Sequence, residues 1–378
     1  MVLRMVPGPT SMSAAVRQAY AEEVGSPDVE TEEFFSDYFV LEATFQRLLN
    51  FSGSIVIGSG EGMVCLWGAL NSVLSPGDTV LCVVNGIFGE GFAGMAKDMK
   101  ANVICVHSDW TQGIDPNTVI AAIKEHNPRL VTLVHCETPS GVKSIEALLM
   151  LELGIVNPLD GIGKAIREYT TDGLFLVDFV SSSFGVVLNV DEELIDLGLF
   201  APQKVLSGPC ALACTTVTER AWERIRELKY QGYDALLPFD GLSPSSPLLL
   251  PYTHNWPAIR ATMAAANAIE TEGKEAVIAR HAAVAQFCRE EAVRLGLELY
   301  CQIIEHASPT VTALKVPTDK LSWEVMEKEL KAEGLICGGS YGSLYGNVFR
   351  IGHMGTQANG SLVKEALDII ARVIASHT

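Results

Sequence analysis

Strand-like and helix-like segments alternate along the first half of this sequence. The first unit is an apolar run at 54–57, a glycine-rich turn at 58–62 and apolar residues at helical spacing up to Val73. Similar runs predict strands at 80–84, 102–106, 130–135 and 174–178, separated by helices at 89–100, 116–125 and 161–169. Strands that alternate with helices are joined by right-handed crossovers. The pattern therefore predicts an α/β fold with a mostly parallel sheet covered by helices, in which ligands bind at the carboxyl ends of the strands.

The second half of the chain follows a different pattern. Residues 257–295 read as helical with a break at Glu272–Gly273. Shorter elements follow, and we expect strands at 310–316 and 348–351 and helices at 322–333 and 361–376. This order predicts a small C-terminal α+β domain. We expect an N-terminal arm at 1–18, a large domain at 19–275 and the small domain at 276–378.

An apolar, leucine-rich segment at 143–155 interrupts this order. The flanking segments at 139–142 and 156–160 would read naturally if they were joined directly. We interpret the segment either as an insertion near the mouth of a site or at a subunit interface, or as a product of the gene prediction.

Charge and composition exclude several classes of partner. The 378 residues include 45 acidic and 27 basic ones, for a formal charge of -18, without a run of lysines or arginines. A nucleic-acid or anionic-membrane partner is therefore not expected. No apolar stretch reaches the length of a membrane span, and sequence that looks folded begins at Met5. We therefore expect neither a membrane segment nor a signal peptide.

Nine cysteines are scattered through apolar runs of the sequence. The pair Cys210 and Cys214 has neither a second pair nor a histidine cluster near it, and the other cysteines show no metal-ligand spacing. We expect reduced cysteines, no metal site and a cytoplasmic protein.

An acidic residue and a lysine stand out between residues 174 and 209. Asp178 ends an apolar strand, where an unpaired carboxylate is costly, and Lys204 lies between apolar residues in a Ser/Gly/Pro setting. Pyridoxal phosphate chemistry needs such a pair, because the amine forms a Schiff base with the cofactor aldehyde and the carboxylate pairs with the pyridine nitrogen. The alternatives are a solvated surface lysine and an aspartate that caps a turn.

Six short segments occur in order along the chain. They cover residues 58–62, 85–89, 135–141, 176–178, 203–204 and 349–355. Together they resemble the class V pyridoxal-phosphate aminotransferases, the family that includes alanine:glyoxylate and serine:pyruvate transaminases. The resemblance covers nearly the whole chain. It implies a fold-type I enzyme that uses pyridoxal 5'-phosphate.

The resemblance gives the two catalytic candidates specific roles. Lys204 corresponds to the Schiff-base lysine, which also moves the proton between the substrate Cα and the cofactor C4′. Removal of this amine from water would lower its pKa and so supply the neutral amine that Schiff-base formation and proton transfer need. Asp178 corresponds to the carboxylate that keeps the pyridine nitrogen protonated.

The glycine-rich turn before the helix at 63–73 predicts a phosphate site. Backbone N–H groups at a helix start bind anions, although any tight turn can use glycine. In the family, Ser59 and Gly60 correspond to phosphate contacts, and Gln203 adds a side-chain donor. Glu61 departs from the pattern because its carboxylate repels a phosphate, so only its backbone amide is useful there.

Two further positions correspond to contacts with the cofactor ring. Phe88 matches the aromatic residue that stacks on the pyridine, and its alternative is an ordinary core residue. Thr138 matches a hydroxyl near the ring oxygen. The spacing leaves open whether Thr138 or Ser140 lies nearer.

Arg350 is the candidate for binding the substrate α-carboxylate. A guanidinium group offers a planar fork that holds a carboxylate at two points. The alternative is a surface arginine in a strand. Residues 7–9, with Gly8 at their centre, resemble the N-terminal loop that closes over the carboxylate in the family.

Tyr252 and Asn255 match positions that reach the phosphate of the neighbouring subunit in the family. This correspondence implies an obligatory homodimer with shared active sites. The alternative is an aromatic-rich loop that packs between domains. The segment around Cys210 also departs from the family's usual Gly-Pro-Pro-Gly after the lysine, which puts the local backbone in question.

The resemblance implies transfer of an amino group from a small amino acid, alanine or serine, to a short 2-oxo acid, glyoxylate or pyruvate. A pyridoxamine:pyruvate transaminase and a 2-aminoethylphosphonate transaminase are the nearest alternatives, and a lyase or desulfurase is a more distant one. The pyridoxamine enzyme has a further arginine where this chain has Tyr341.

Overall fold

The computed structural model describes residues 2–143, 159, 161–243 and 250–377. Apart from Lys143, the predicted insertion at 143–155 lies outside the described residues. None of the described helices combines the length and the apolar composition needed to span a membrane.

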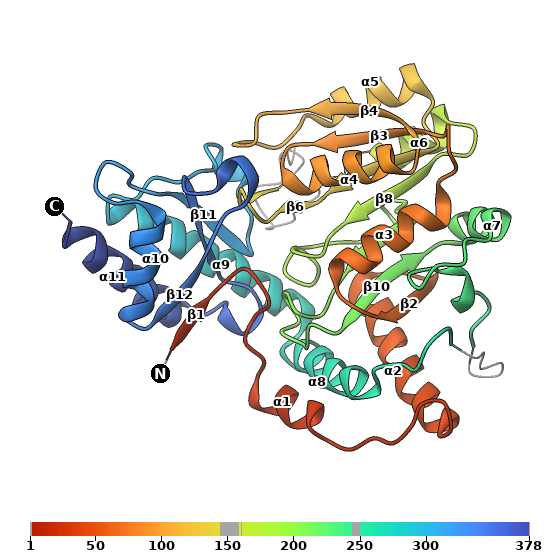
Figure 1. Ribbon diagram of the computed structural model, residues 1–378, viewed down its shortest axis with the longest axis horizontal. Coiled ribbons are helices and arrows are strands. Elements are labelled where there is room, and N and C mark those ends of the chain that lie inside the picture. Colours follow the sequence, from red (N-terminus) through yellow and green to blue (C-terminus); the bar gives the residue numbers. More distant parts are fainter. Residues whose placement is uncertain (1, 144–158, 160, 244–249, 378) are drawn as a thin grey trace.

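A seven-stranded sheet forms the centre of the larger part of the molecule (Figure 1). Its order is β2 (Ser54–Ser59), β10 (Leu212–Val217), β9 (Leu197–Phe200), β8 (Leu174–Asp178), β5 (Leu130–Val134), β3 (Thr79–Val84) and β4 (Asn102–His107). Strand β10 runs antiparallel to both of its neighbours, and the other pairs are parallel. The predicted mostly parallel sheet is confirmed.

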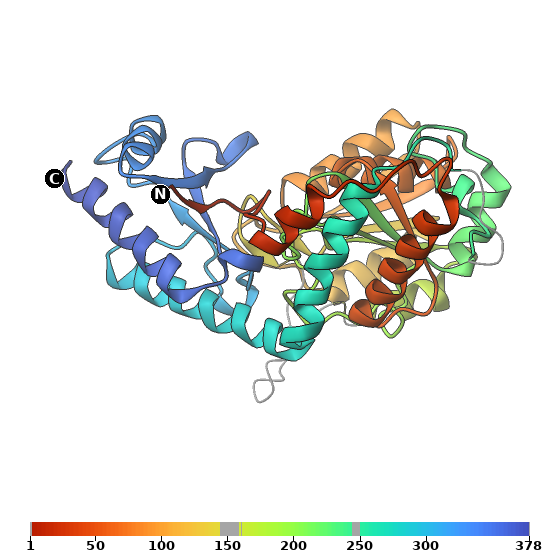
Figure 2. The ribbon, with the colours of Figure 1, turned by 90° about the horizontal axis from the view of Figure 1, so that it is seen from below.

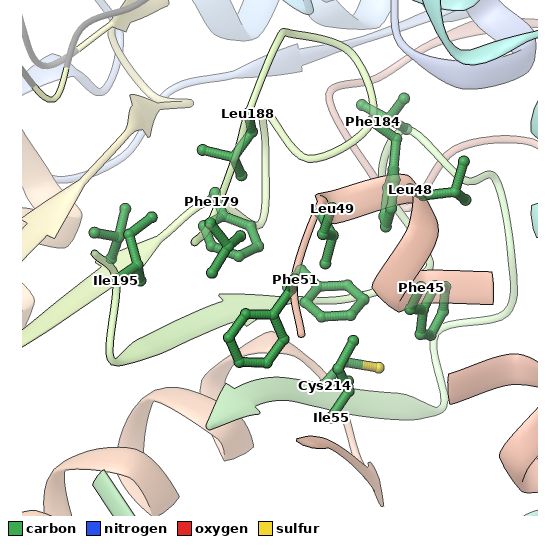
Figure 3. Close-up of a cluster of buried hydrophobic side chains, with 14 of the residues drawn as sticks. Phe45, Leu48, Leu49, Phe51, Ile55, Phe179, Phe184, Leu188, Ile195 and Cys214 are labelled. Atoms are coloured by element: carbon green, nitrogen blue, oxygen red, sulfur yellow. The ribbon is translucent and has the colours of Figure 1, made fainter. Parts of the chain in front are cut away.

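Alternate residues of each strand point to opposite sides of the sheet, and both sides carry apolar side chains. Helices therefore cover both faces of this sheet. Ile55 and Ile57 of β2 join one buried cluster, whereas Val56 joins the other. The first cluster packs against α2 (Thr31–Leu49), α5 (Pro116–His126), α6 (Ile162–Tyr169) and α8 (Trp256–Glu272). The second packs against α3 (Gly62–Val73), α4 (Ile87–Asp98) and α7 (Glu219–Leu228). Figure 3 shows part of the first cluster, where Phe45 and Leu48 lie near Phe184.

A second, four-stranded sheet organises the C-terminal part of the chain. Its order is β1 (Leu3–Met5), β12 (Leu335–Gly339), β13 (Val348–Gly352) and β11 (Val311–Lys315). The elements α9 (Lys274–Arg294), α10 (Trp323–Ala332) and α11 (Gly360–Ala375) pack with it around a separate buried cluster. Strand β1 pairs parallel with β12, so the start of the chain lies in the C-terminal sheet (Figure 2). After it, α1 (Ala14–Tyr20) packs against α8 of the larger part.

The predicted helices and strands are confirmed within a few residues at their ends, including the helix break at Gly273 between α8 and α9. Strands β1, β9, β10 and β12, the two-residue strands β6 (Cys136–Glu137) and β7 (Val142–Lys143) and helix α7 are not predicted. The short β9 carries a glycine, and β10 is rich in threonine and small residues, so neither has the strong apolar pattern of the other strands. The division of the chain into an arm and two domains stays a prediction.

The chain direction brings six strand ends together. Strands β2, β3, β4, β5, β8 and β9 run the same way, so their carboxyl ends lie along one edge of the sheet. Strand β10 runs the opposite way and starts at this edge, where Leu212 pairs with Ser59. Loops that leave this edge carry most of the predicted site residues.

Candidate active site

A cavity of about 130 Å³ lies at this edge of the sheet. Six of the predicted site residues line it, namely Glu61, Phe88, Thr138, Asp178, Gln203 and Lys204. The other lining residues are Gly62, Met63, Leu66, Cys136, Val180 and Ser181. The structure therefore brings together residues that lie more than 140 positions apart in the sequence.

Lys204 follows β9 and reaches into the cavity. Its Nζ donates a hydrogen bond to the carbonyl oxygen of Pro7 at 2.7 Å. Removal of the amine from water, with a further contribution from the positive charge of Arg350, lowers the pKa of Lys204 to about 8. A substantial fraction of this amine is therefore neutral near pH 8, as a nucleophile or a base must be.

Asp178 is the last residue of β8, and its side chain is buried. Its Oδ1 accepts a hydrogen bond from the backbone N–H of Val180 at 2.9 Å. Burial raises the pKa of Asp178 to about 6. A buried carboxyl of this kind gains most from a cationic N–H donor in the cavity, because such a donor offsets the cost of its ionised form.

Glu61 caps the N-terminus of α3, where the sequence predicts the phosphate site. Its Oε1 accepts a hydrogen bond from the backbone N–H of Met63 at 3.0 Å. The carboxylate therefore points toward the first turn of α3. The backbone N–H groups of Glu61 and Gly62 have no acceptor among the described residues, so they remain available to an anion at this helix start.

Ser59 and Gly60, the two predicted phosphate contacts, differ from Glu61 and Gly62 in the state of their backbone N–H groups. Their backbone N–H groups already have partners, since Ser59 donates to the hydroxyl of Tyr252 at 3.0 Å and Gly60 donates to the carbonyl of Ala211 at 3.0 Å. Gly60 has a φ of +143°. A side chain there would be strained, which explains the glycine.

Tyr252 and Asn255 both contact Ser59 within the single chain. In addition to the Tyr252 contact, the backbone N–H of Asn255 donates to Ser59 Oγ at 3.3 Å. The Tyr252 ring stacks on Tyr233 with a centroid distance of 4.7 Å, and Asn255 caps α8 by accepting from Ala258 N–H at 3.1 Å. The two residues thus lie beside the expected phosphate site. Their predicted role across a subunit interface stays a prediction.

Thr138 and Ser140 have different surroundings. Thr138 lines the cavity, and its Oγ1 shares a hydrogen bond with Ser181 Oγ. Ser140 does not line the cavity, and its Oγ donates to the carbonyl of Glu137 at 3.3 Å. Of the two residues that the sequence left open, Thr138 therefore shares the cavity lining with Lys204 and Asp178.

Arg350 lies in β13 of the small sheet, and only 3% of its surface is exposed. Its Nε donates to the carbonyl of Gly339 at 2.8 Å, and its Nη1 lies 3.5 Å from the carbonyl of Thr138. The guanidinium carbon is 4.8 Å from the ring centroid of Tyr341. Among the described residues no carboxylate pairs with Arg350. Within the described part of the chain this buried cation therefore has carbonyl and aromatic partners but no counter-anion.

Gly8 packs directly on the side chain of Lys204. A Cβ atom at this position would lie 2.6 Å from Cδ and 2.9 Å from both Cε and Nζ of Lys204. The N-terminal segment therefore contacts Lys204 directly, which is possible because Gly8 lacks a side chain. The predicted closure of residues 7–9 over a substrate carboxylate stays a prediction.

Sequence reasoning missed several residues at the cavity. Ser181 follows the strand-end Asp178 closely, and a hydroxyl at that distance from a strand end was the signal that could have identified it. Pro7 contacts Lys204 through its backbone carbonyl, which accepts the hydrogen bond from Nζ. A backbone group carries no signal in the sequence.

Comparisons with known proteins agree with the fold. Residues 28–343 match the family described as Aminotransferase class-V. An uncharacterised aminotransferase of Methanocaldococcus jannaschii is 31% identical over 360 residues, which cover 93% of this chain and 88% of that protein. Serine–glyoxylate aminotransferase of Arabidopsis thaliana is 28% identical over 360 residues, which cover 93% and 84%.

A solved structure extends the similarity to the whole chain. Pyridoxamine–pyruvate aminotransferase from Mesorhizobium loti superposes with a TM-score of 0.90 at 26% identity, over 100% of this chain and 92% of that one. The architecture is that of the fold-type I pyridoxal-phosphate enzymes. Within that class, the chain belongs to the class V aminotransferase family. Class V aminotransferases use pyridoxal phosphate.

The residues around the cavity fit this cofactor. Lys204 supplies an amine and Asp178 a buried carboxyl, while the N–H groups of Glu61 and Gly62 at the α3 N-terminus have no acceptor among the described residues. The Oε1 atom of Gln203 is buried and has no hydrogen-bond partner among the described residues. When bound, the cofactor withdraws the electrons left at the substrate Cα after its proton leaves.

Proposed function

We propose that this transaminase moves an amino group from a small amino acid, alanine or serine, to a short 2-oxo acid, glyoxylate or pyruvate. The observation that carries the proposal is the buried guanidinium of Arg350. It has no counter-anion among the residues that the structure describes, and its Nη1 lies 3.5 Å from the carbonyl of Thr138, a residue that lines the cavity. A single guanidinium at this place suits a substrate with one carboxylate.

Each residue has a task that follows from its surroundings. Arg350 binds the substrate α-carboxylate and so orients the bonds at Cα. Lys204 Nζ, with its lowered pKa, takes the proton from the substrate Cα and would deliver it to C4′ of the cofactor, and the second half of the reaction runs this transfer in reverse. Asp178 would keep the pyridine nitrogen of the cofactor protonated. Phe88 would contact the cofactor ring, and the backbone N–H groups of Glu61 and Gly62 would bind its phosphate.

The apolar side of the cavity supports the choice of short substrates. Met63, Leu66 and Val180 line it together with Phe88. These side chains offer no charged partner to a long polar substrate, whereas a methyl or hydroxymethyl group fits beside them. The serine–glyoxylate enzyme of Arabidopsis, which covers 93% of this chain, supports the same choice.

We also propose a homodimer in which Tyr252 and Asn255 approach the phosphate of the partner subunit. Support comes from the match of both positions to family positions that reach the phosphate of the neighbouring subunit, whereas within the single chain both residues contact Ser59. Size-exclusion chromatography with light scattering measures the mass of the assembly. A mass of one chain, 40.7 kDa, in protein loaded with cofactor would contradict the dimer.

Pyridoxamine is the second candidate donor. One specific observation favours it, namely the carboxylate of Glu61 at the α3 N-terminus, where a cofactor phosphate would sit. The similarity to the pyridoxamine–pyruvate enzyme of Mesorhizobium loti points the same way. The free N–H groups of Glu61 and Gly62 favour the phosphate instead.

A donor panel tests the proposal. Alanine, serine, 2-aminoethylphosphonate and pyridoxamine are each paired with glyoxylate and pyruvate, and both products are quantified. The proposal predicts that kcat/KM is highest for alanine or serine and that Lys204→Ala abolishes turnover. A preference for pyridoxamine or 2-aminoethylphosphonate would overturn the substrate assignment. Release of ammonia or sulfide without transfer would indicate a lyase or desulfurase.

A further inference from the structure

Glu137 is a carboxylic acid that is completely buried next to the site and has no task in the proposed reaction. It lies in β6 (Cys136–Glu137), directly before Thr138. Its Oε1 accepts a hydrogen bond from the backbone N–H of Gly89 at 2.7 Å, and its Oε2 accepts one from the N–H of Phe88 at 3.2 Å. Both donors belong to the first turn of α4.

Two glycines make room for this carboxyl group. A Cβ atom at Gly86 would lie 2.4 Å from the Glu137 Cδ and 2.6 Å from its Oε2. A Cβ at Gly89 would lie 3.5 Å from Oε1 and 2.7 Å from the carbonyl oxygen of Val83. The turn before α4 is therefore shaped around the side chain of Glu137, as well as around its own backbone.

Glu137 occupies this position at an energetic cost. Among the described residues no lysine, arginine or histidine forms an ion pair with it, and the charged groups that act on it most are the carboxylates Asp178 and Glu90. Burial is the main reason why the pKa of Glu137 rises to about 8. A neutral side chain of the same shape would avoid this cost. Costly groups of this kind cluster where a protein needs a fixed geometry.

The two segments that Glu137 joins, the start of α4 and the end of β6, carry groups that line the cavity. Its amide partner Phe88 supplies the aromatic side chain, and its neighbour Thr138 supplies the hydroxyl. The carbonyl of Thr138 also lies 3.5 Å from Nη1 of Arg350. A shift of the Glu137 carboxyl group therefore moves the Phe88 backbone relative to Thr138.

We propose that Glu137 is a positioning residue for the cofactor ring. By accepting hydrogen bonds from two N–H groups of the α4 first turn, it fixes the position of the Phe88 aromatic ring relative to Thr138. This inference rests on the proposed function, because it assigns the Phe88 ring to the cofactor. It predicts that Glu137 acts on cofactor binding through Phe88.

A double-mutant cycle tests this prediction. Apo-protein is titrated with pyridoxal phosphate, and the dissociation constant is measured for wild type, Glu137→Gln, Phe88→Leu and the double variant. In the Gln variant the amide NH₂ faces a backbone N–H, so one of the two hydrogen bonds is lost. Loss of one such bond weakens binding by about 10-fold if the ring position depends on it. Glu90→Gln is the matched control, since Glu90 is an exposed acid on the same turn that makes no hydrogen bond with these N–H groups and acts on Glu137 only through its charge.

The expected result is non-additive. Each single variant binds about 10-fold more weakly, and the double variant stays within about threefold of the singles instead of reaching about 100-fold. The visible circular dichroism of bound cofactor changes in Glu137→Gln and not in Glu90→Gln. Effects that multiply to about 100-fold, or a Gln variant that binds like wild type, overturn the proposal.

Further arms separate the ways in which the test can fail. If Glu137→Gln does not fold, Glu137→Asp replaces it, because the shorter side chain keeps the carboxyl group but does not reach both N–H groups, and the same non-additivity is expected. Wild type that binds no pyridoxal phosphate contradicts the cofactor assignment itself. Wild type that binds it covalently at Lys204 while the cycle is multiplicative contradicts only the role of Glu137.

Discussion

The Nζ atom of Lys204 lies 2.7 Å from the carbonyl oxygen of Pro7, a residue almost 200 positions earlier in the chain. Pro7 follows β1, which belongs to the C-terminal sheet, whereas Lys204 follows β9 of the central sheet. The hydroxyl of Thr10 strengthens this connection by donating to the carbonyl of Lys204 at 2.8 Å. The N-terminal segment thus links the C-terminal sheet to the amine at the centre of the site.

This relationship predicts that Gly8→Ala disturbs the Lys204 amine. The new methyl group would lie 2.6–2.9 Å from three side-chain atoms of Lys204. We expect the covalently bound fraction of cofactor, measured by visible absorbance at a limiting concentration, to fall by about 10-fold. Gly77→Ala is the matched control, because Gly77 also has a positive φ, +89°, but a Cβ there meets no atom within 4 Å. Equal losses in the two variants would show that backbone strain, and not the contact with Lys204, is responsible.

Arg350→Ala tests the carboxylate assignment. Loss of a two-point, charge-assisted contact should raise the KM for the amino donor by about 100-fold. The dissociation constant of pyridoxal phosphate should change by less than about threefold, because the guanidinium has no assigned contact with the cofactor. Arg372→Ala, which removes an exposed arginine of α11, is the control for a general effect of charge. An unchanged KM, or a cofactor affinity that falls in parallel, would contradict the role of Arg350.

The raised pKa of Glu137 predicts how stability depends on pH. Its ordinary value is 4.5, and burial raises the pKa to about 8 in the folded protein. Between these values the folded state binds more protons than the unfolded state, so this group's contribution to stability is lost as pH rises from about 4.5 to about 8. Glutamine does not titrate. The Tm of Glu137→Gln relative to wild type should therefore increase from pH 5 to pH 8, as measured by differential scanning calorimetry. A relative Tm that stays constant or decreases would show that Glu137 is ionised throughout this range.

The sequence predicts the fold well where strong apolar runs alternate with helical spacing. Strands β3, β5 and β8 are buried on both faces, and a continuous apolar run is the direct signal of such a strand. Strand β9 has four residues, and its pairing with β8 and β10 depends on distant segments that local patterns do not contain. The position of β1 in the C-terminal sheet is missed for the same reason.

The candidate site is predictable to the extent that side-chain chemistry marks it. Lys204 and Asp178 stand out because each is a charged group in apolar surroundings, and both line the cavity. The Pro7 carbonyl does not stand out, since every residue has such a group. The sequence also does not show where the Glu61 carboxylate points. It points toward α3 because it accepts a hydrogen bond from the backbone N–H of Met63, and this contact exists only once the helix has formed.

The most direct test of the central claim is to identify the lysine that holds the cofactor. Wild type and Lys204→Ala are incubated with pyridoxal phosphate, reduced with borohydride and digested, and the modified peptides are located by mass spectrometry. The account predicts one reduced cofactor adduct on the wild-type peptide that contains Lys204 and none in the variant. An adduct on a different lysine, or an unmodified Lys204 peptide in wild type that has bound the cofactor, would contradict it.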